Sequence, residues 1–425
     1  MEILLILSAL IGLLLLRVPV AIAMASLGAI LLWLKGLPMI MVSQFMISGV
    51  DSFELLAVPL FLLMSHILLV GGIGSDLFRA VQSWVGHWPG GLAVATVITC
   101  ALFAAISGSS VATAATVGTV VIAEMTKRGY PKFFVLGLVA AGGTLGILIP
   151  PSIPMIIYGV ITEASIPKLF LAGIGPGLFL AGLFIAYSFA FARYNKEYQR
   201  SDKATREERL TATIAALPVA LIAFVVVGGI YGGLFTPSEA AGVGFFLSLA
   251  IVLAKRKNTF ADIHSAAMAA MKTTVTVLLI VAAAALFGKS ITIYQIPQDV
   301  TVFVATAFSE PWLFTLVICI VLLVMGLFLE SLSMLLIMMP VLFESLAPMG
   351  LHPIWFGIMF VIMIECALIT PPVGMNLFVV QAVGKAKLSE VIQGVWPFVL
   401  IMLGTAVLLW FLPGLAMYIP FGSKF

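Results

Sequence analysis

The stretch GILIPPSI, residues 146–153, places two consecutive prolines inside an otherwise unbroken apolar segment. A second pair stands in LITPPVGM, residues 368–375. The spacing between the pairs is constant, because 371 − 150 and 372 − 151 both equal 221. A proline inside a helix removes a backbone N–H donor and displaces the carbonyl four residues earlier. The sequence therefore predicts two helices that are broken at corresponding places in two related halves.

The composition is that of an integral membrane protein. Of the 425 residues, 62% are hydrophobic and 9% are charged, and the formal net charge of +3 is too small to indicate a nucleic-acid partner. A spanning helix needs about 20 apolar residues. Segments of this kind lie at 18–34, 53–71, 133–161, 168–192, 210–231, 238–254, 272–292, 354–384 and 390–419.

The spacing of 221 extends over most of the chain. It pairs Ser110 with Ser331, Gly129 with Gly350 and Pro176 with Pro397, without a gap. Residues 1–205 and 222–425 are therefore predicted to be two copies of one unit. The hydrophilic segment 193–210 forms the loop between them, and residues 206–221 are expected to hold the end of this linker and the start of the next helix.

The charges of the loops predict opposite orientations for the two copies. Loops rich in Lys and Arg stay in the cytoplasm, which places the central linker and the basic loop KRGYPK, residues 127–132, inside. The corresponding loop PMGLHP, residues 348–353, has no Lys or Arg and is expected outside. An inverted-topology repeat is typical of secondary transporters, whose binding site lies near the middle of the membrane.

Two apolar segments are predicted to be re-entrant hairpins. In the first, about 92–126, the small polar cluster ISGSSVAT at 106–113 interrupts the apolar run. In the second, about 313–348, the stretch VMGLFLESLSM at 324–334 occupies the corresponding place. Non-helical backbone at membrane depth is tolerated where it lines a cavity or is buried in protein. Each hairpin tip is therefore expected beside a broken helix, one over 133–161 and the other over 354–384.

The two breaks are predicted to bind sodium. The prolines should free the carbonyls of Gly146, Ile147, Ala367 and Leu368, and the C-terminal end of a half-helix carries a partial negative charge. A desolvated monovalent cation satisfies both. The expected ligands, mostly backbone oxygens, are Ser107, Gly146, Ile149 and Pro150 at one site, and Gly326, Ala367, Thr370 and Val373 at the other. The alternative is that each proline pair only kinks a helix.

Polar groups near the tips are candidates for contacts with a substrate. The hydroxyls and the amide that we expect there are those of Ser109, Ser110, Thr113, Ser152 and Asn376. Glu330, at the second tip, is a candidate for balancing the charge of bound cations or for proton linkage; the alternative is a residue that reaches the membrane interface. Glu365 is placed behind the second site, where it either supports that site or is a buried structural group.

Nothing in the sequence indicates an enzyme or an organic cofactor. The four histidines show no HExxH spacing, and no GxSxG motif occurs. The three cysteines, Cys100, Cys319 and Cys366, form no CxxC pair and lie in apolar segments. We therefore expect no catalytic residues.

Four motifs resemble the large membrane subunit (M, DctM-like) of tripartite ATP-independent periplasmic (TRAP) transporters. They are SGSSVATAATVG at 107–118, ILIPPSIPMIIYG at 147–159, GLFTPSEAAGVG at 233–244 and ITPPVGMNLFVV at 369–380. The resemblance covers essentially the whole chain. It implies an all-α integral membrane protein of the elevator-type ion-transporter superfamily, with the inverted repeat, the re-entrant hairpins and the broken helices described above.

The resemblance also implies a function and partners. It implies a sodium-driven carrier of the bacterial inner membrane that imports an organic acid, such as a C4-dicarboxylate, a sialic acid or a similar carboxylate. The expected partners are a separate small four-helix membrane subunit and a soluble periplasmic substrate-binding protein, besides the lipid bilayer. Two alternatives remain open: a stand-alone sodium–dicarboxylate carrier, and a non-transporting membrane scaffold or receptor for a periplasmic binding protein.

Overall fold

The computed structural model describes residues 2–195, 198, 201–308 and 310–422, and their side chains apart from those of residues 2–4 and 7. All secondary structure in this part of the chain is helical. The elements are α1 (Glu2–Leu15), α2 (Val20–Leu34), α3 (Ile40–Val50), η1 (Glu54–Leu56), α4 (Ala57–Val70), α5 (Ile73–Val85), α6 (Gly91–Ser107), α7 (Ser110–Lys127), α8 (Lys132–Leu148), α9 (Ile153–Thr162), α10 (Ile166–Tyr194), α11 (Arg206–Tyr231), α12 (Pro237–Lys255), α13 (Phe260–Ile293), α14 (Ile296–Ala307), α15 (Pro311–Met325), α16 (Ser331–Leu346), α17 (Pro353–Ile369), α18 (Met375–Gly384), α19 (Leu388–Phe411) and α20 (Gly414–Phe421).

The chain is a multi-pass membrane protein. Six helical segments of the described part are long and apolar enough to cross a membrane, and one of them combines α8 with α9. A further candidate is the pair formed by α3 and the segment Glu54–Val70, which is bent by 67°. The shorter apolar helices include α6 of the first predicted hairpin, both helices of the second and the two halves of the second broken helix.

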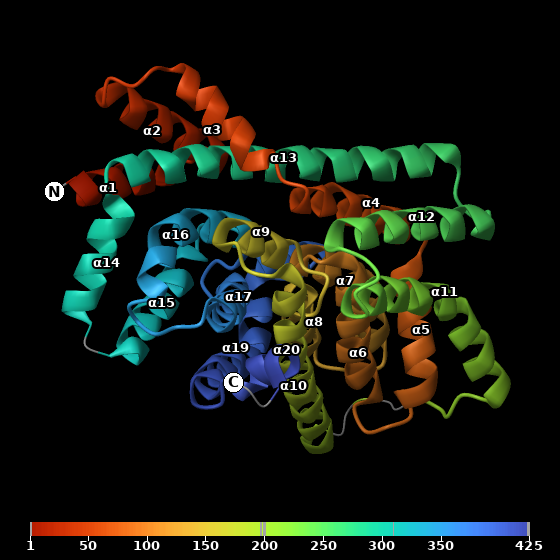
Figure 1. Ribbon diagram of the computed structural model, residues 1–425. Helices are drawn as coiled ribbons and strands as arrows, with labels where there is room; N and C mark the ends of the chain where they lie inside the picture. The colour runs from red at the N-terminus through yellow and green to blue at the C-terminus, as the bar shows by residue number, and fades with distance from the viewer. Residues whose placement is uncertain (1, 196–197, 199–200, 309, 423–425) are drawn as a thin grey trace.

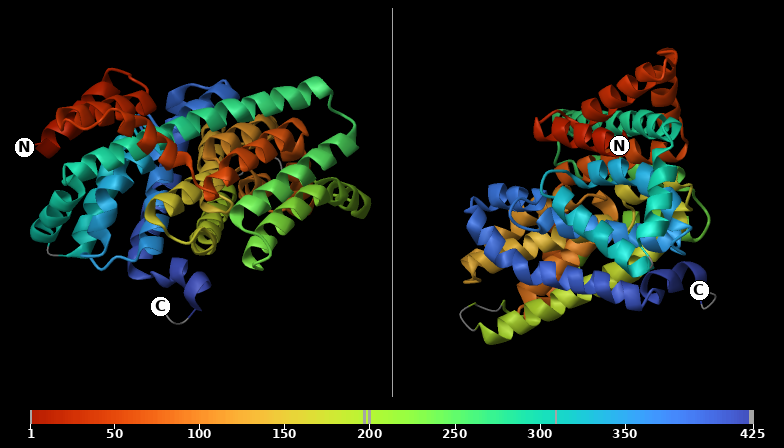
Figure 2. Two further views of the ribbon diagram at one scale, coloured as in Figure 1. Left: turned by 45° about the horizontal axis from the view of Figure 1, so that its top comes forward. Right: turned by 90° about the vertical axis from the view of Figure 1, so that its left-hand side faces the viewer.

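The long helix α13 crosses the upper part of the molecule in Figure 1, with α2 and α3 above it and α4 and α12 below it. We call these five helices the upper layer; the right-hand view of Figure 2 shows α13, α2 and α3 lying above most of the chain. Small residues permit the close contact. A Cβ atom added to Gly28 would lie 3.0 Å from the Leu286 side chain, and one added to Gly49 would overlap Ala285.

The core below the upper layer is built around α8 and α17. Residues 134–148 of α8 and 354–369 of α17 are all buried. The neighbouring helix α19 approaches α8 so closely that a side chain at Gly137 would overlap the backbone of Gly394. Because these helices contact protein on all sides, their polar groups must find partners inside the molecule.

Two predicted boundaries are wrong. The segment 390–419 was expected to form one span, but α19 ends at Phe411 and α20 begins at Gly414. Pro413 lies at this break, where it cannot continue the ladder of the preceding helix. The predicted linker 193–210 is also too long, because α11 begins at Arg206. The Thr205 hydroxyl and the Glu208 carboxylate form a capping box that starts this helix.

Several helices of the second half repeat the bounds of the first. The first and last residues of α17 are those of α8 plus 221, since 353 − 132 and 369 − 148 both equal 221. Helices α7 and α16 start at Ser110 and Ser331, which have the same spacing. The Pro150–Pro151 and Pro371–Pro372 bonds are both cis. The domain division and the opposite orientation of the halves in a membrane stay predictions.

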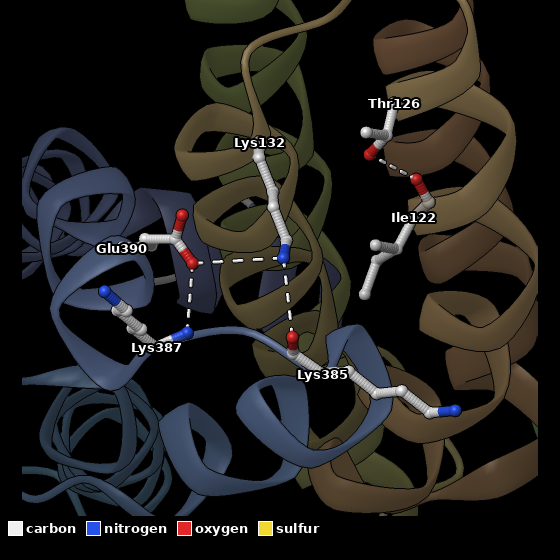
Figure 3. Close-up of polar contacts among 6 residues, drawn as sticks. All are labelled: Ile122, Thr126, Lys132, Lys385, Lys387 and Glu390. Atoms are coloured by element: carbon white, nitrogen blue, oxygen red, sulfur yellow. Dashed lines mark hydrogen bonds and ion pairs between the residues drawn. The ribbon is translucent and has the colours of Figure 1, made fainter.

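The central linker and the loop 127–132, both predicted to be cytoplasmic, meet two further loops at one end of the molecule. Tyr198 of the central linker accepts a hydrogen bond from Gly90 N–H at 2.9 Å, and its ring lies 4.5 Å from that of Tyr130. Figure 3 shows Lys132, at the start of α8, with its Nζ atom 3.5 Å from the Lys385 carbonyl and 3.9 Å from Glu390 Oε2. Four loops from both halves are therefore neighbours.

Candidate functional site

The first hairpin, α6 and α7, turns through a short non-helical tip. Gly108 has a φ of 58°, and a Cβ atom there would lie 3.0 Å from the Pro151 carbonyl, so the position favours glycine. The Ser107 hydroxyl lies 2.7 Å from the Thr113 hydroxyl, which donates to the Ser109 carbonyl at 2.8 Å. Three oxygens thus gather at the tip of the hairpin.

The first break directly contacts this tip. Helix α8 ends at Leu148, and α9 restarts after Ser152. A Cβ atom at Gly146 would lie 2.7 Å from both the Ser109 carbonyl and the Thr113 hydroxyl. The structure therefore brings the predicted ligand Gly146 against the hairpin residues, at a distance that leaves no room for a side chain.

Two carbonyls at the first break lack a hydrogen-bond donor. The Ile149 N–H still bonds to the Leu145 carbonyl at 3.0 Å. The next two donors that a continuous helix would supply are missing, because positions 150 and 151 are prolines. Within the described part of the chain, the carbonyls of Gly146 and Ile147 accept no hydrogen bond, as the sequence predicts.

The second break differs from the first. Gly326, after α15, lies so close to Ala367 that an added Cβ atom would overlap the Ala367 side chain. The Ala367 carbonyl, expected to be free, accepts a hydrogen bond from Thr370 N–H at 3.2 Å. That expectation is wrong, because the last turn of α17 tightens. The Thr370 hydroxyl donates to the Cys366 carbonyl at 2.7 Å, which leaves its lone pairs available.

The two breaks also differ in burial. Pro150 and Pro151 are buried, and Ile149 is half-buried. At the second break Pro372 is exposed, while Thr370 and Val373 are half-buried. The first break is enclosed by the hairpin and neighbouring helices, and the second is open on one side.

The predicted substrate contacts fall into three groups. Ser110 and Thr113 are buried in α7, and Ser109 is half-buried at the tip. The Ser152 hydroxyl is fully buried and accepts a hydrogen bond from Met155 N–H at 3.4 Å, so it caps α9. Asn376, at the start of α18, is fully buried, and both polar atoms of its side chain lack a partner among the described residues. A buried amide without a hydrogen-bond partner can bind the polar groups of a ligand.

Two acidic residues lie near the hairpins. Glu330 stands at the N-terminus of α16 and accepts a weak hydrogen bond from the Ser333 hydroxyl at 3.4 Å. It is half-buried. Glu365 lies inside α17 with 1% of its surface exposed, and neither carboxylate oxygen has a hydrogen-bond partner of good geometry in the described structure.

A cavity of the described structure lies away from the hairpins and breaks. It has a volume of about 550 Å³, and none of the predicted site residues lines it. Its walls come from α5 and from the start of α11: Asp76, Arg79, Thr205, Glu207, Glu208, Thr211, Ala212 and Ala215. The cavity is open and of mixed charge, at the end of the molecule where the linker lies.

The fold has a counterpart among solved structures. It is similar to the crystal structure of the YdaH transporter of Alcanivorax borkumensis, with a TM-score of 0.60, 14% sequence identity, and coverage of 89% of this chain and 88% of that one. At this identity the likeness concerns the fold alone. The sequence comparisons narrow the class further.

The family model of the tripartite ATP-independent periplasmic transporter, DctM component, matches residues 7–415. The C4-dicarboxylate TRAP transporter large permease protein of Rhodobacter capsulatus is 36% identical and covers 99% of both chains. The isethionate TRAP transporter permease protein DctMQ of Oleidesulfovibrio alaskensis is 34% identical over 94% of this chain and 64% of that protein. The chain therefore belongs to the DctM family, the large permease subunits of TRAP transporters.

Proposed function

We propose that this protein is the sodium-coupled large subunit of a TRAP transporter that imports an organic acid across the bacterial inner membrane. A periplasmic binding protein delivers the acid, and a separate small membrane subunit completes the transporter. The relatives support an acid as the substrate class, because one is named for C4-dicarboxylates and another for isethionate.

The observation that carries the proposal is the contact between the first break and the first hairpin. The unbonded carbonyls of Gly146 and Ile147 lie at the C-terminal end of a half-helix. In that last turn Gly146 packs against the Thr113 hydroxyl, which lies 2.7 Å from the Ser107 hydroxyl. Such backbone and hydroxyl oxygens fit a desolvated monovalent cation. In the described residues no group of three or more His, Cys, Asp or Glu side chains is placed to hold a metal ion. The donor set is therefore suited to sodium.

The second site would use fewer backbone groups. Thr370 offers hydroxyl lone pairs, and Gly326 and Val373 lie on either side of the break. Asn376, close to the same break in sequence, is suited to bind the polar groups of the substrate. The hairpins and broken helices would move as one body past the upper layer, as in an elevator-type carrier.

Uptake into proteoliposomes tests the proposal. The vesicles contain this chain, its candidate small subunit and the binding protein, and they receive pooled labelled organic acids with or without a sodium gradient. We expect uptake that requires both the gradient and the binding protein. Sodium-driven uptake by this chain alone would favour a stand-alone carrier, and no uptake under any gradient would favour a scaffold.

The variant Thr370→Val separates the contributions at the second break. If the hydroxyl binds sodium, the variant needs a higher sodium concentration for half-maximal uptake. If backbone oxygens alone bind the ion, the sodium dependence is unchanged.

A further inference from the structure

Glu365 is a buried charge that the two predicted sodium sites do not use. Its side chain is 1% exposed, and no described residue forms an ion pair with it. An ionised carboxylate without a partner in an apolar interior costs several kcal/mol. A chain that retains such a group in its most buried helix must supply a compensating charge from a bound ligand or a proton.

The residues near Glu365 identify the neighbouring site. The carboxyl group lies near the hydroxyl of Ser110, in the first turn of α7, but the two form no hydrogen bond of good geometry. That turn follows the hairpin tip at which Ser107, Thr113 and Gly146 meet. The sequence placed Glu365 behind the second site; the structure places it against the first hairpin.

The corresponding residue of the other half has no charge. Because 365 − 144 equals 221, Glu365 corresponds to Thr144, whose hydroxyl donates to the Ala141 carbonyl at 2.6 Å. Thr144 is thus satisfied within its own helix, whereas Glu365 is not. The carboxylate is a feature of one half and does not follow from the repeat.

We propose that Glu365 is the counter-charge for the cation held at the first hairpin, and that it acts through the first turn of α7. The proposal rests on the sodium-coupled function proposed above. The oxygens of Ser107, Ser109, Thr113 and Gly146 are all neutral, so a nearby carboxylate would supply the negative charge that the site otherwise lacks. Glu365 is then a positioning residue that acts on the ion through Ser110.

Sodium-dependent thermal stabilisation of the purified full chain tests this role without transport. The melting temperature is measured against sodium concentration for the wild type, Glu365→Gln and Glu365→Asp, with potassium as the control ion. We expect Glu365→Gln to raise the half-maximal sodium concentration at least tenfold and to melt no lower than the wild type without sodium. We expect Glu365→Asp to restore part of the sodium response.

The outcomes distinguish the two proposals. A wild type that sodium does not stabilise more than potassium would overturn the sodium-coupled function and this inference together. A normal sodium response in the wild type and an equal half-maximal concentration in Glu365→Gln would overturn the role of Glu365 alone. A variant that melts lower without sodium but keeps the wild-type half-maximal concentration would show a structural carboxyl group.

A second, independent inference concerns the turns that connect the upper layer to the hairpins. Helix α5 follows α4 through Gly72, with a φ of 71°, and α14 follows α13 through Gln295, with a φ of 59°. We call these turns the first and second elbows. Each leads into a short helix, α5 or α14, that precedes a hairpin, and these two helices lie at opposite sides of the molecule in Figure 1.

The first elbow is held by the end of α12. Lys255 Nζ lies 2.6 Å from Asp76 Oδ2, with about a fifth of each side chain exposed (20% and 22%). The Asn258 amide donates to the Val70 carbonyl at 2.8 Å. A Cβ atom at Gly71 would lie 2.7 Å from the Val252 side chain, so backbone and side chain are in close contact.

The second elbow is held by the corresponding end of α2, through different groups. Lys35 Nζ lies 4.4 Å from the centre of the Tyr294 ring, and the Tyr294 hydroxyl donates to the Leu31 carbonyl at 3.0 Å. Lys35 and Lys255 stand at equivalent helix ends, since 255 − 35 equals 220, one less than the repeat spacing. One elbow is thus held by an ion pair and the other by a cation–π contact.

We infer that the Asp76–Lys255 pair positions the first hairpin relative to the upper layer during transport. The pair is partly buried and joins α5, which follows the glycine turn, to α12, which packs against α4. Losing one partner therefore lets α5 change its angle to α4. The pair acts by charge, so exchanging the two residues should preserve it. A structural contact that depends on side-chain shape would not survive that exchange.

A charge exchange tests the pair. We expect Lys255→Met and Asp76→Asn each to lower the rate of uptake by the complete transporter at least fivefold, and Asp76→Lys with Lys255→Asp to recover at least half of the wild-type rate. The matched control exchanges Lys132 and Glu390, which are 3.9 Å apart and more exposed, and should leave the rate unchanged. Single variants with wild-type rates, or an exchange without recovery in a chain that melts normally, would overturn the inference.

Discussion

Gly146 determines how closely the first break approaches the hairpin tip. A methyl group there would lie 2.7 Å from the Ser109 carbonyl, which belongs to the backbone and cannot turn aside. We expect Gly146→Ala to lower the free energy of unfolding by about 1–3 kcal/mol, the usual cost of an overfilled core. The variant should also require more sodium for half-maximal uptake. Thermal unfolding and the proteoliposome assay measure the two effects.

Gly182→Ala is the matched control. Gly182 also lies within a helix, α10, but a Cβ atom there would have no atom within 4 Å. Alanine is favoured over glycine in a helix interior, so this variant should be as stable as the wild type or slightly more stable. Equal losses in both variants would show that Gly146 has no special contact.

The hairpins and broken helices could be predicted because each break leaves a local signal in the sequence. Small polar clusters and proline pairs interrupt long apolar runs, and the structure has α6 and α7 over 91–127 and the broken helix over 132–162. The capping box of Thr205 and Glu208 is also a local signal, and it lies inside the charged segment that composition alone predicts to be a linker. The contact of Glu365 with Ser110 could not be predicted, because 255 residues separate them (365 − 110) and no spacing reports which face of α17 meets α7.

The start of α9 offers a test that separates capping from substrate binding. Ser152 was predicted to contact the substrate, yet its hydroxyl accepts from Met155 N–H. Loss of an N-cap to alanine costs about 1 kcal/mol, and loss to glycine only a few tenths. We expect Ser152→Ala to melt lower than Ser152→Gly, with both near the wild-type affinity for the substrate. The equivalent start of α18 already has a glycine, Gly374.

Melting curves and the substrate concentration for half-maximal uptake check this prediction together. If the Ser152 hydroxyl binds the substrate, alanine and glycine remove the same contact, and both variants weaken uptake equally. That result would show that Ser152 contacts the substrate as well as capping α9.

The arrangement of the whole chain in the membrane can be tested at one pair of positions. Lys127 ends α7, Pro348 follows α16, and both are exposed; 348 − 127 equals the repeat spacing of 221. An inverted repeat requires equivalent positions to face opposite sides, and the basic loop belongs inside. We expect a membrane-impermeant thiol reagent to label Pro348→Cys in intact spheroplasts, and Lys127→Cys only after the membrane is opened.

The native cysteines permit this measurement, because Cys100 and Cys366 are buried and Cys319 is half-buried. The unmodified chain, treated in the same way, gives the background. Tyr198 of the linker contacts Tyr130, and Lys132 contacts the Lys385 carbonyl, so that loops of both halves lie at one end of the fold. Labelling of both cysteines from the same side would contradict the inverted repeat and the midplane site that depends on it. Labelling from opposite sides would show that the two hairpins enter the membrane from opposite faces.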